Sequence, residues 1–270
     1  MRDNNNLWVW GYVLKDIPGE MRFTDRLSFC SLETGAEYLG ADNVVFMDSA
    51  NDRANLNDEI FGHVAGSKKV ICGLQHGHYA ETARMLSEFA ATHPNIVGAN
   101  IDDFHCLGSP SETMTVEELR EIRQALDSVT PGLKLYLVCY FYRFQEEALE
   151  QFRDLFDGLI VWCWDSSTHF WQVEYEYAIQ KLRHDFPDKE ILQGQFIHAY
   201  GDGFQWTGTR PQPMDQLELQ CDKIANTLRD GRTNGWVVLQ NGFFSYPDHR
   251  RQVQFLKDYF EWMLGTWTAR

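Results

Sequence analysis

The chain has 270 residues, of which 44% are hydrophobic and 23% are charged, so it has enough apolar side chains for one large core. Asp and Glu number 39 against 24 Lys and Arg, which gives a formal net charge of −15. Such a balance repels nucleic-acid phosphates and anionic lipids, and we therefore expect neither a nucleic-acid nor a membrane partner.

Eight short runs rich in β-branched and aromatic residues follow one another along the chain, and helical patterns fill the gaps between them. The predicted strands are 7–14, 43–49, 68–76, 95–105, 133–143, 158–166, 190–200 and 235–244. The clearest predicted helices are 115–129, which begins with a capping box of Thr115 and Glu118, 213–231 and 249–264. Eight such units predict a (β/α)8 barrel, or TIM barrel, that forms a single domain over residues 1–270. A doubly wound sheet is the alternative, but its glycine-rich phosphate-binding loop does not follow the first strand.

The sequence contains no apolar run of the roughly 20 residues that cross a bilayer, and its first residues lack a signal-peptide cleavage pattern. We therefore expect a cytoplasmic protein. The six cysteines are far apart and do not have the spacing of a zinc site. We expect buried free thiols, in a reducing compartment, at Cys30, Cys72, Cys106, Cys139, Cys163 and Cys221.

The residues at the ends of the predicted strands indicate the substrate class, because the active groups of a (β/α)8 barrel lie at the carboxyl ends of its strands. These ends carry carboxylates, amides, histidines and aromatic rings, with almost no lysine and one arginine, which argues against a phosphate substrate. Tryptophan and tyrosine rings stack on the apolar faces of sugars, whereas amides and carboxylates bind sugar hydroxyls. The pattern predicts a small carbohydrate substrate, bound by Trp10, Tyr12, His76, His105, Tyr142, Trp164, Asp165, His198, Tyr200, Gln240 and Asn241. Trp8, Trp162 and Trp236 lie deeper in their strands, where packing is the more natural role.

Two adjacent aspartates end the fourth predicted strand. Strand side chains alternate, so the apolar set Val97, Ala99 and Ile101 is expected to face the helices and Asp102 the barrel interior. Asp103 follows where the strand ends and can turn toward the mouth of the barrel. Neighbouring carboxyls repel each other as anions, and one ionised and one protonated carboxyl is the arrangement that glycosidic cleavage needs. We therefore predict Asp102 and Asp103 as catalytic residues, although Asp103 could instead only cap the following turn.

The whole pattern resembles glycoside-hydrolase-type (β/α)8 barrels, and the stretch IVGANIDDFH (96–105) is similar to the fourth strand of O-GlcNAc-hydrolase-type hexosaminidases. In that family the first aspartate orients the acetamido group of the substrate, which is the internal nucleophile, and the second is the general acid/base. The resemblance implies the first role for Asp102 and the second for Asp103. It leaves open whether Asp102 is instead a direct nucleophile and whether the anomeric configuration is retained or inverted.

The histidines support a second hypothesis. His76 and His78 form an H-x-H pair that could bind a metal ion together with Asp102, His105 and His198. Metal-dependent barrel hydrolases usually carry such a pair on their first strand, together with a bridging lysine, whereas here it follows the third strand. We therefore expect no metal and no other cofactor. The alternatives that remain are a metal-assisted or acid/base sugar isomerase or lyase, and a sugar-binding barrel without turnover.

Overall fold

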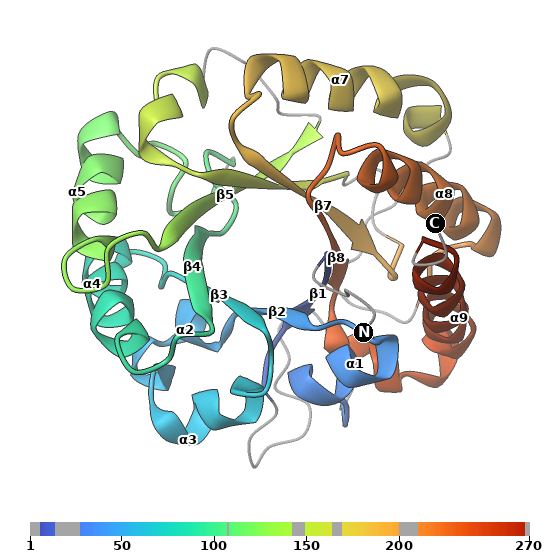
Figure 1. Ribbon diagram of the computed structural model, residues 1–270, viewed down its shortest axis with the longest axis horizontal. Coiled ribbons are helices and arrows are strands. Elements are labelled where there is room, and N and C mark those ends of the chain that lie inside the picture. Colours follow the sequence, from blue (N-terminus) through green and yellow to red (C-terminus); the bar gives the residue numbers. More distant parts are fainter. Residues whose placement is uncertain are drawn as a thin grey trace.

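The computed structural model describes residues 6–13, 28–106, 108–141, 149–163, 169–199 and 210–267. Its eight parallel strands pair in chain order and close into a barrel, because β8 also pairs with β1 (Figure 1). The strands are β1 (Leu7–Gly11), β2 (Asn43–Phe46), β3 (Lys69–Gly73), β4 (Ile96–Ile101), β5 (Lys134–Tyr140), β6 (Gly158–Trp162), β7 (Glu190–Phe196) and β8 (Gly235–Leu239). The predicted (β/α)8 barrel is confirmed.

Helices surround the strands as an outer ring (Figure 1). They are α1 (Leu32–Leu39), α2 (Asp48–Asn51), α3 (Asp58–Phe61), α4 (Tyr79–Ala90), α5 (Val116–Leu126), α7 (Tyr175–Asp185), α8 (Met214–Arg229) and α9 (Arg250–Trp267). Shorter 3-10 or π turns are η1 (Arg53–Asn55), η2 (Gly62–Val64), η4 (Arg153–Leu155), η5 (Phe170–Glu174), η6 (Asn241–Ser245) and η7 (Pro247–His249). The predicted capping box is present at α5, where Thr115 and Glu118 each bond the other's backbone N–H.

One predicted helical segment is divided into short pieces. Between β2 and β3 the chain forms α2, η1, α3 and η2 in place of one long helix. The side chains of Asp52 and Asn57 accept hydrogen bonds from the backbone N–H groups of Ala54 and Ile60. Each bond caps a new helical turn, and this local capping divides the segment.

All eight strands begin within one residue of their predicted starts, but each ends earlier than predicted. For example, β4 ends at Ile101 and β5 ends at Tyr140. Past these points the chain must turn outward to reach the next helix, and Asp103 and His105 adopt left-handed conformations with φ of 49° and 54°. The residues at the mouth of the barrel therefore lie in turns.

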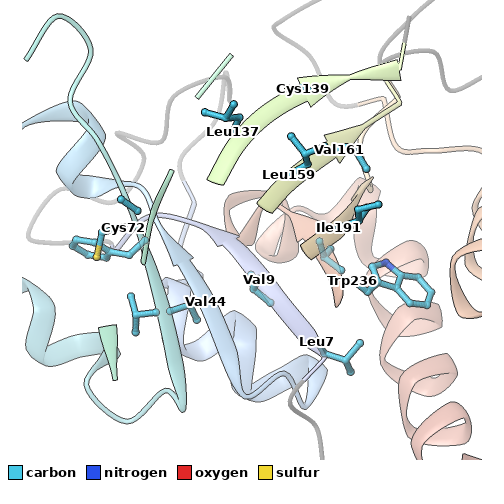
Figure 2. Packing of buried hydrophobic residues seen from close by; sticks show 14 of the residues in the cluster. Leu7, Val9, Val44, Cys72, Leu137, Cys139, Leu159, Val161, Ile191 and Trp236 are labelled. Carbon is cyan, nitrogen blue, oxygen red and sulfur yellow. The ribbon is translucent and has the colours of Figure 1, made fainter. Parts of the chain in front are cut away.

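Two apolar clusters hold the barrel together. The larger one lies between the strands and the helices, and Figure 2 shows its side chains projecting from successive strands, with Trp236 on β8 among them. The smaller one fills the barrel interior and includes Trp8 and Trp162. These three tryptophans pack in the core as expected.

The predicted facing of β4 is right for Ala99 and Ile101, which belong to the outer cluster, and wrong for Val97, which packs against the interior cluster. The register of β3 against β4 shifts at this point, so that Val70 pairs with Ile96 and Ile71 pairs with Gly98. This irregularity takes Val97 out of the regular alternation.

All six cysteines are free and buried, as predicted. Burial raises the pKa of the Cys30 thiol to about 11, with a further contribution from Glu33, and burial also raises the pKa of Cys72, Cys139 and Cys221. In the described part of the chain no helix has the length and apolar character to cross a membrane.

Candidate functional site

The two predicted catalytic aspartates lie in the turn directly after β4, at the carboxyl end of the barrel. Both are partly buried. Asp103 has a φ of 49°, and its backbone N–H donates to Oδ1 of Asp102 at 3.2 Å. Aspartate is one of the few residues that tolerate this left-handed region, and residues held there often belong to functional sites.

Tyr140 fixes the carboxylate of Asp103. It is the last residue of β5, and its hydroxyl donates to Oδ1 of Asp103 at 2.8 Å. The pKa of Tyr140 is raised well above its usual value by burial first, and then by the negative charges of Asp103 and Asp102. The phenol therefore stays protonated at neutral pH and remains a donor.

A second group of side chains holds the backbone of Asp103. The hydroxyl of Ser111 donates to the Asp103 carbonyl at 3.0 Å and lies 3.2 Å from the hydroxyl of Ser109. The hydroxyl of Tyr79 lies 3.1 Å from Nδ1 of His76. Burial raises the pKa of Tyr79 to about 12, and the charges of Asp102 and Asp103 contribute to this increase. His76, predicted as a substrate-binding residue, thus contacts a tyrosine that lies close enough to the aspartate pair to be affected by its charge.

Aromatic rings lie inside the barrel at the height of Tyr140. Trp162 pairs with Tyr140 in register, packs edge-on against Trp10 with ring centroids 5.7 Å apart, and stacks on Phe196 at 4.9 Å. Tyr12 belongs to the same interior cluster. Trp10 and Tyr12 therefore lie in the barrel interior, and both are largely buried. Their contact with a sugar stays a prediction.

The side-chain amide of Asn241 binds backbone groups of two other residues. Its Nδ2 donates to the carbonyls of Tyr12 and Cys30 at 2.9 and 2.7 Å, and its Oδ1 accepts from the backbone N–H of Tyr12 at 3.1 Å. The side chain is fully buried and joins the segments that follow β8 and β1. Gln240, its neighbour, is buried directly after β8. The binding of sugar hydroxyls by Gln240 and Asn241 stays a prediction.

The predicted histidines are not gathered at one point. Nε2 of His105 lies 2.9 Å from the Met114 carbonyl, and His198 is buried with Nδ1 3.1 Å from Nε2 of His249. His78 is largely exposed and forms an ion pair with Glu81. Among the described residues, no group of three or more His, Cys, Asp or Glu is arranged to hold a metal ion.

Four of the predicted substrate-binding residues, Tyr142, Trp164, Asp165 and Tyr200, lie outside the described residues. Three residues at or near the aspartate pair, Tyr140, Tyr79 and Ser111, are absent from the predicted set. The inward face of β5 was a usable signal for Tyr140, since it continues the alternation from Tyr136 through Val138. Tyr79 and Ser111 lie at a helix start and in a loop, where no periodicity indicates direction.

Comparison with known proteins supports the fold and goes no further. No protein-family model matches the chain, and no curated protein matches it in sequence. Among solved structures it is similar to a β-glucuronidase of Faecalibacterium prausnitzii, with a TM-score of 0.56 and 11% identity over 85% of this chain and 44% of that chain. It is also similar to the α-subunit of tryptophan synthase from Pyrococcus furiosus, with a TM-score of 0.54 and 13% identity over 98% of this chain and 99% of that one.

At such identities the likeness shows a shared barrel alone. This chain corresponds to less than half of the glucuronidase chain. One similar structure is a glycosidase by name and the other is a synthase subunit, which agrees with the general rule that this fold carries many chemistries.

Proposed function

We propose that this protein is a glycoside hydrolase in which Asp102 and Asp103 are the working carboxyl pair. The observation that supports the proposal most is the fixed position of Asp103. Its carboxylate, its N–H and its carbonyl each have a partner, namely Tyr140, Asp102 and Ser111. A carboxyl that is fixed at one oxygen and whose backbone is held on both sides is preorganised for proton transfer.

In this proposal Asp103 donates a proton to the glycosidic oxygen as the bond to the leaving group breaks, and later takes a proton from the attacking water. Asp102 faces the anomeric side, where it orients an acetamido group of the substrate or attacks the anomeric carbon itself. The aromatic layer of Trp10, Trp162 and Phe196 lies beneath, and rings of this kind suit the apolar face of a sugar.

The described surroundings of Asp103 favour an uncharged sugar. Within the described residues, no lysine or arginine forms an ion pair with Asp103. A carboxylate-bearing or phosphorylated substrate would meet the Asp103 carboxylate there, and its negative charge would be repelled.

The test is chromophore release from a panel of aryl α- and β-glycosides that includes N-acetylhexosaminides, with and without EDTA. Asp103→Asn is compared with Asp42→Asn, a matched control because Asp42 precedes β2 at the opposite end of the barrel and pairs with Lys68 on the surface. We expect chelator-insensitive turnover that falls at least about 100-fold in Asp103→Asn and is unchanged in Asp42→Asn.

Two results would contradict the proposal. Turnover that EDTA abolishes would favour a metal-assisted sugar isomerase or lyase, and a sugar that binds without turnover would favour a binding barrel. If N-acetylhexosaminides alone react, the acetamido group takes part and the role of Asp102 as its orienter is supported.

A further inference from the structure

Two tyrosines on β5 each donate a hydrogen bond to a carboxylate. Tyr136 and Tyr140 are four residues apart on the inward face of the strand, and the interior cluster contains the first and contacts the second. The hydroxyl of Tyr136 donates to Oε2 of Glu190 at 2.6 Å, and that of Tyr140 donates to Oδ1 of Asp103 at 2.8 Å. Each phenol therefore binds a carboxylate, one at each end of the barrel.

The carboxylates differ in what else holds them. Glu190 also forms an ion pair with Lys134 and begins a strand. Asp103 has no such cation among the described residues, and its backbone is in the left-handed region. The direction of the Asp103 carboxylate therefore depends on the phenol of Tyr140 far more than the direction of Glu190 depends on Tyr136.

We infer that Tyr140 is a positioning residue that aims the carboxylate of Asp103 into the barrel mouth. The inference rests on the proposed function for its effect on turnover, but the effect on Asp103 itself is independent of any substrate. The hydrogen bond selects one orientation of the carboxylate, which matters for proton transfer because a displacement of about 1 Å can cost about 100-fold in rate.

Other titratable groups among the described residues act on this pair, and the test leaves them in place. They include Asp102 and Cys106 in the turn after β4, Cys139 on β5 and Tyr79 on α4. His76 contacts Tyr79. A change that follows from the loss of one phenol oxygen at position 140 can therefore be assigned to that oxygen.

The experiment compares Tyr140→Phe with Tyr136→Phe, which removes the same atom from the same face of the same strand. The first measurement uses no substrate. Protein labelled with 13C at the aspartate carboxyl carbons is examined by NMR at pH 7, and the Asp103 resonance is assigned by its loss in Asp103→Asn. We expect the chemical shift of the Asp103 carboxyl carbon to change in Tyr140→Phe, because the carboxylate loses its phenol donor, and to stay unchanged in Tyr136→Phe.

The second measurement is steady-state kinetics on whichever glycoside the wild-type protein cleaves. We expect Tyr140→Phe to lower kcat by about 10- to 100-fold with KM within about threefold, because the substrate still binds while the carboxyl is misaligned. Tyr136→Phe should leave both within about threefold. The urea midpoint of each variant is measured alongside, so that a loss of activity caused by unfolding is recognised. If Tyr140→Phe does not fold, Ser111→Ala is the second variant, because it removes the hydrogen bond to the Asp103 carbonyl. It too should lower kcat and leave KM unchanged.

The outcomes separate the two proposals. A changed Asp103 carboxyl chemical shift in Tyr140→Phe without any glycosidase activity in the wild-type protein supports the role of Tyr140 and contradicts the proposed function. An unchanged chemical shift in Tyr140→Phe, or a kcat equal to that of Tyr136→Phe, overturns the inference even if the wild-type protein is a glycosidase.

Discussion

Tyr136 and Glu190 form a hydrogen bond of 2.6 Å at the amino end of the barrel, where Lys134 also pairs with the same carboxylate. Burial by itself would raise the pKa of Glu190, but the bonds from Lys134 and Tyr136 outweigh it and the pKa is lowered. The bonds from Lys134 and Tyr136 to Glu190 join β5 to β7 across β6. It is thus a structural counterpart of the Tyr140–Asp103 pair at the other end.

The stability of the protein should fall in acid partly through Glu190. Because the pKa of Glu190 is lower in the folded state, its contribution is full above its unfolded pKa of about 4.3 and is lost as the pH falls through the folded value. We expect Glu190→Gln to lower the urea midpoint at pH 7 and to have little effect at pH 3. Urea unfolding at the two pH values checks this, and an equal loss at both would contradict it.

Gly194 on β7 leaves room for the ring of Trp162. A Cβ atom at position 194 would lie 2.1 Å from Cε3 of Trp162, so the indole or the strand must move. We expect Gly194→Ala to lower the free energy of unfolding by about 1–3 kcal/mol, the usual cost of overpacking a core. Near-ultraviolet circular dichroism should also change, because Trp162 lies between Trp10 and Phe196.

Gly62→Ala is the matched control for that substitution, since a Cβ atom there meets nothing within 4 Å. Gly62 follows α3 in a helical conformation, with φ of −51°. The substitution should change the free energy of unfolding by less than about 1 kcal/mol, and in the stabilising direction if at all. A loss as large as that of Gly194→Ala would mean that contact with Trp162 is not the cause.

Asn241 joins the chain after β8 to the chain after β1, and this link should be important for stability. Asn241→Ala would leave the N–H and carbonyl of Tyr12 and the carbonyl of Cys30 buried without this partner. We expect a loss of about 3 kcal/mol in the free energy of unfolding, since each buried unsatisfied group costs about 1–3 kcal/mol. In Asn226→Ala the lost amide bonds Arg229, also on α8, and we expect the free energy of unfolding to change by less than about 0.5 kcal/mol.

If Asn241→Ala is as stable as Asn226→Ala, the buried amide is not needed for stability. The predicted role of Asn241 in binding sugar hydroxyls would then be the stronger explanation for this residue. Gly11 belongs to the same arrangement, because a Cβ atom there would lie 1.7 Å from Oδ1 of Asn241. Glycine is the one residue that allows Asn241 to lie so close to β1.

The sequence by itself determined the eight strands, their order and the barrel that they form. The reason is that a strand buried on both faces must be a continuous apolar run, and such runs are visible without any long-range information. The start of each strand was found for the same reason, as was the capping box of Thr115 and Glu118, which depends on residues only three apart. The burial of Cys72, Cys139 and Cys163 also followed from the apolar segments around them.

The directions of the polar side chains at the mouth were decided by the tertiary structure. The sequence placed Asp102 and Asp103 at the end of β4, but the partners of Asp103, Tyr140 and Ser111, come from β5 and a loop, and no local pattern links these. The irregularity that turns Val97 inward depends on how β3 and β4 pair. Asn241 was predicted from its chemistry to bind hydroxyls, and the structure uses the same chemistry to bind backbone groups of Tyr12, because the close approach at Gly11 brings them together.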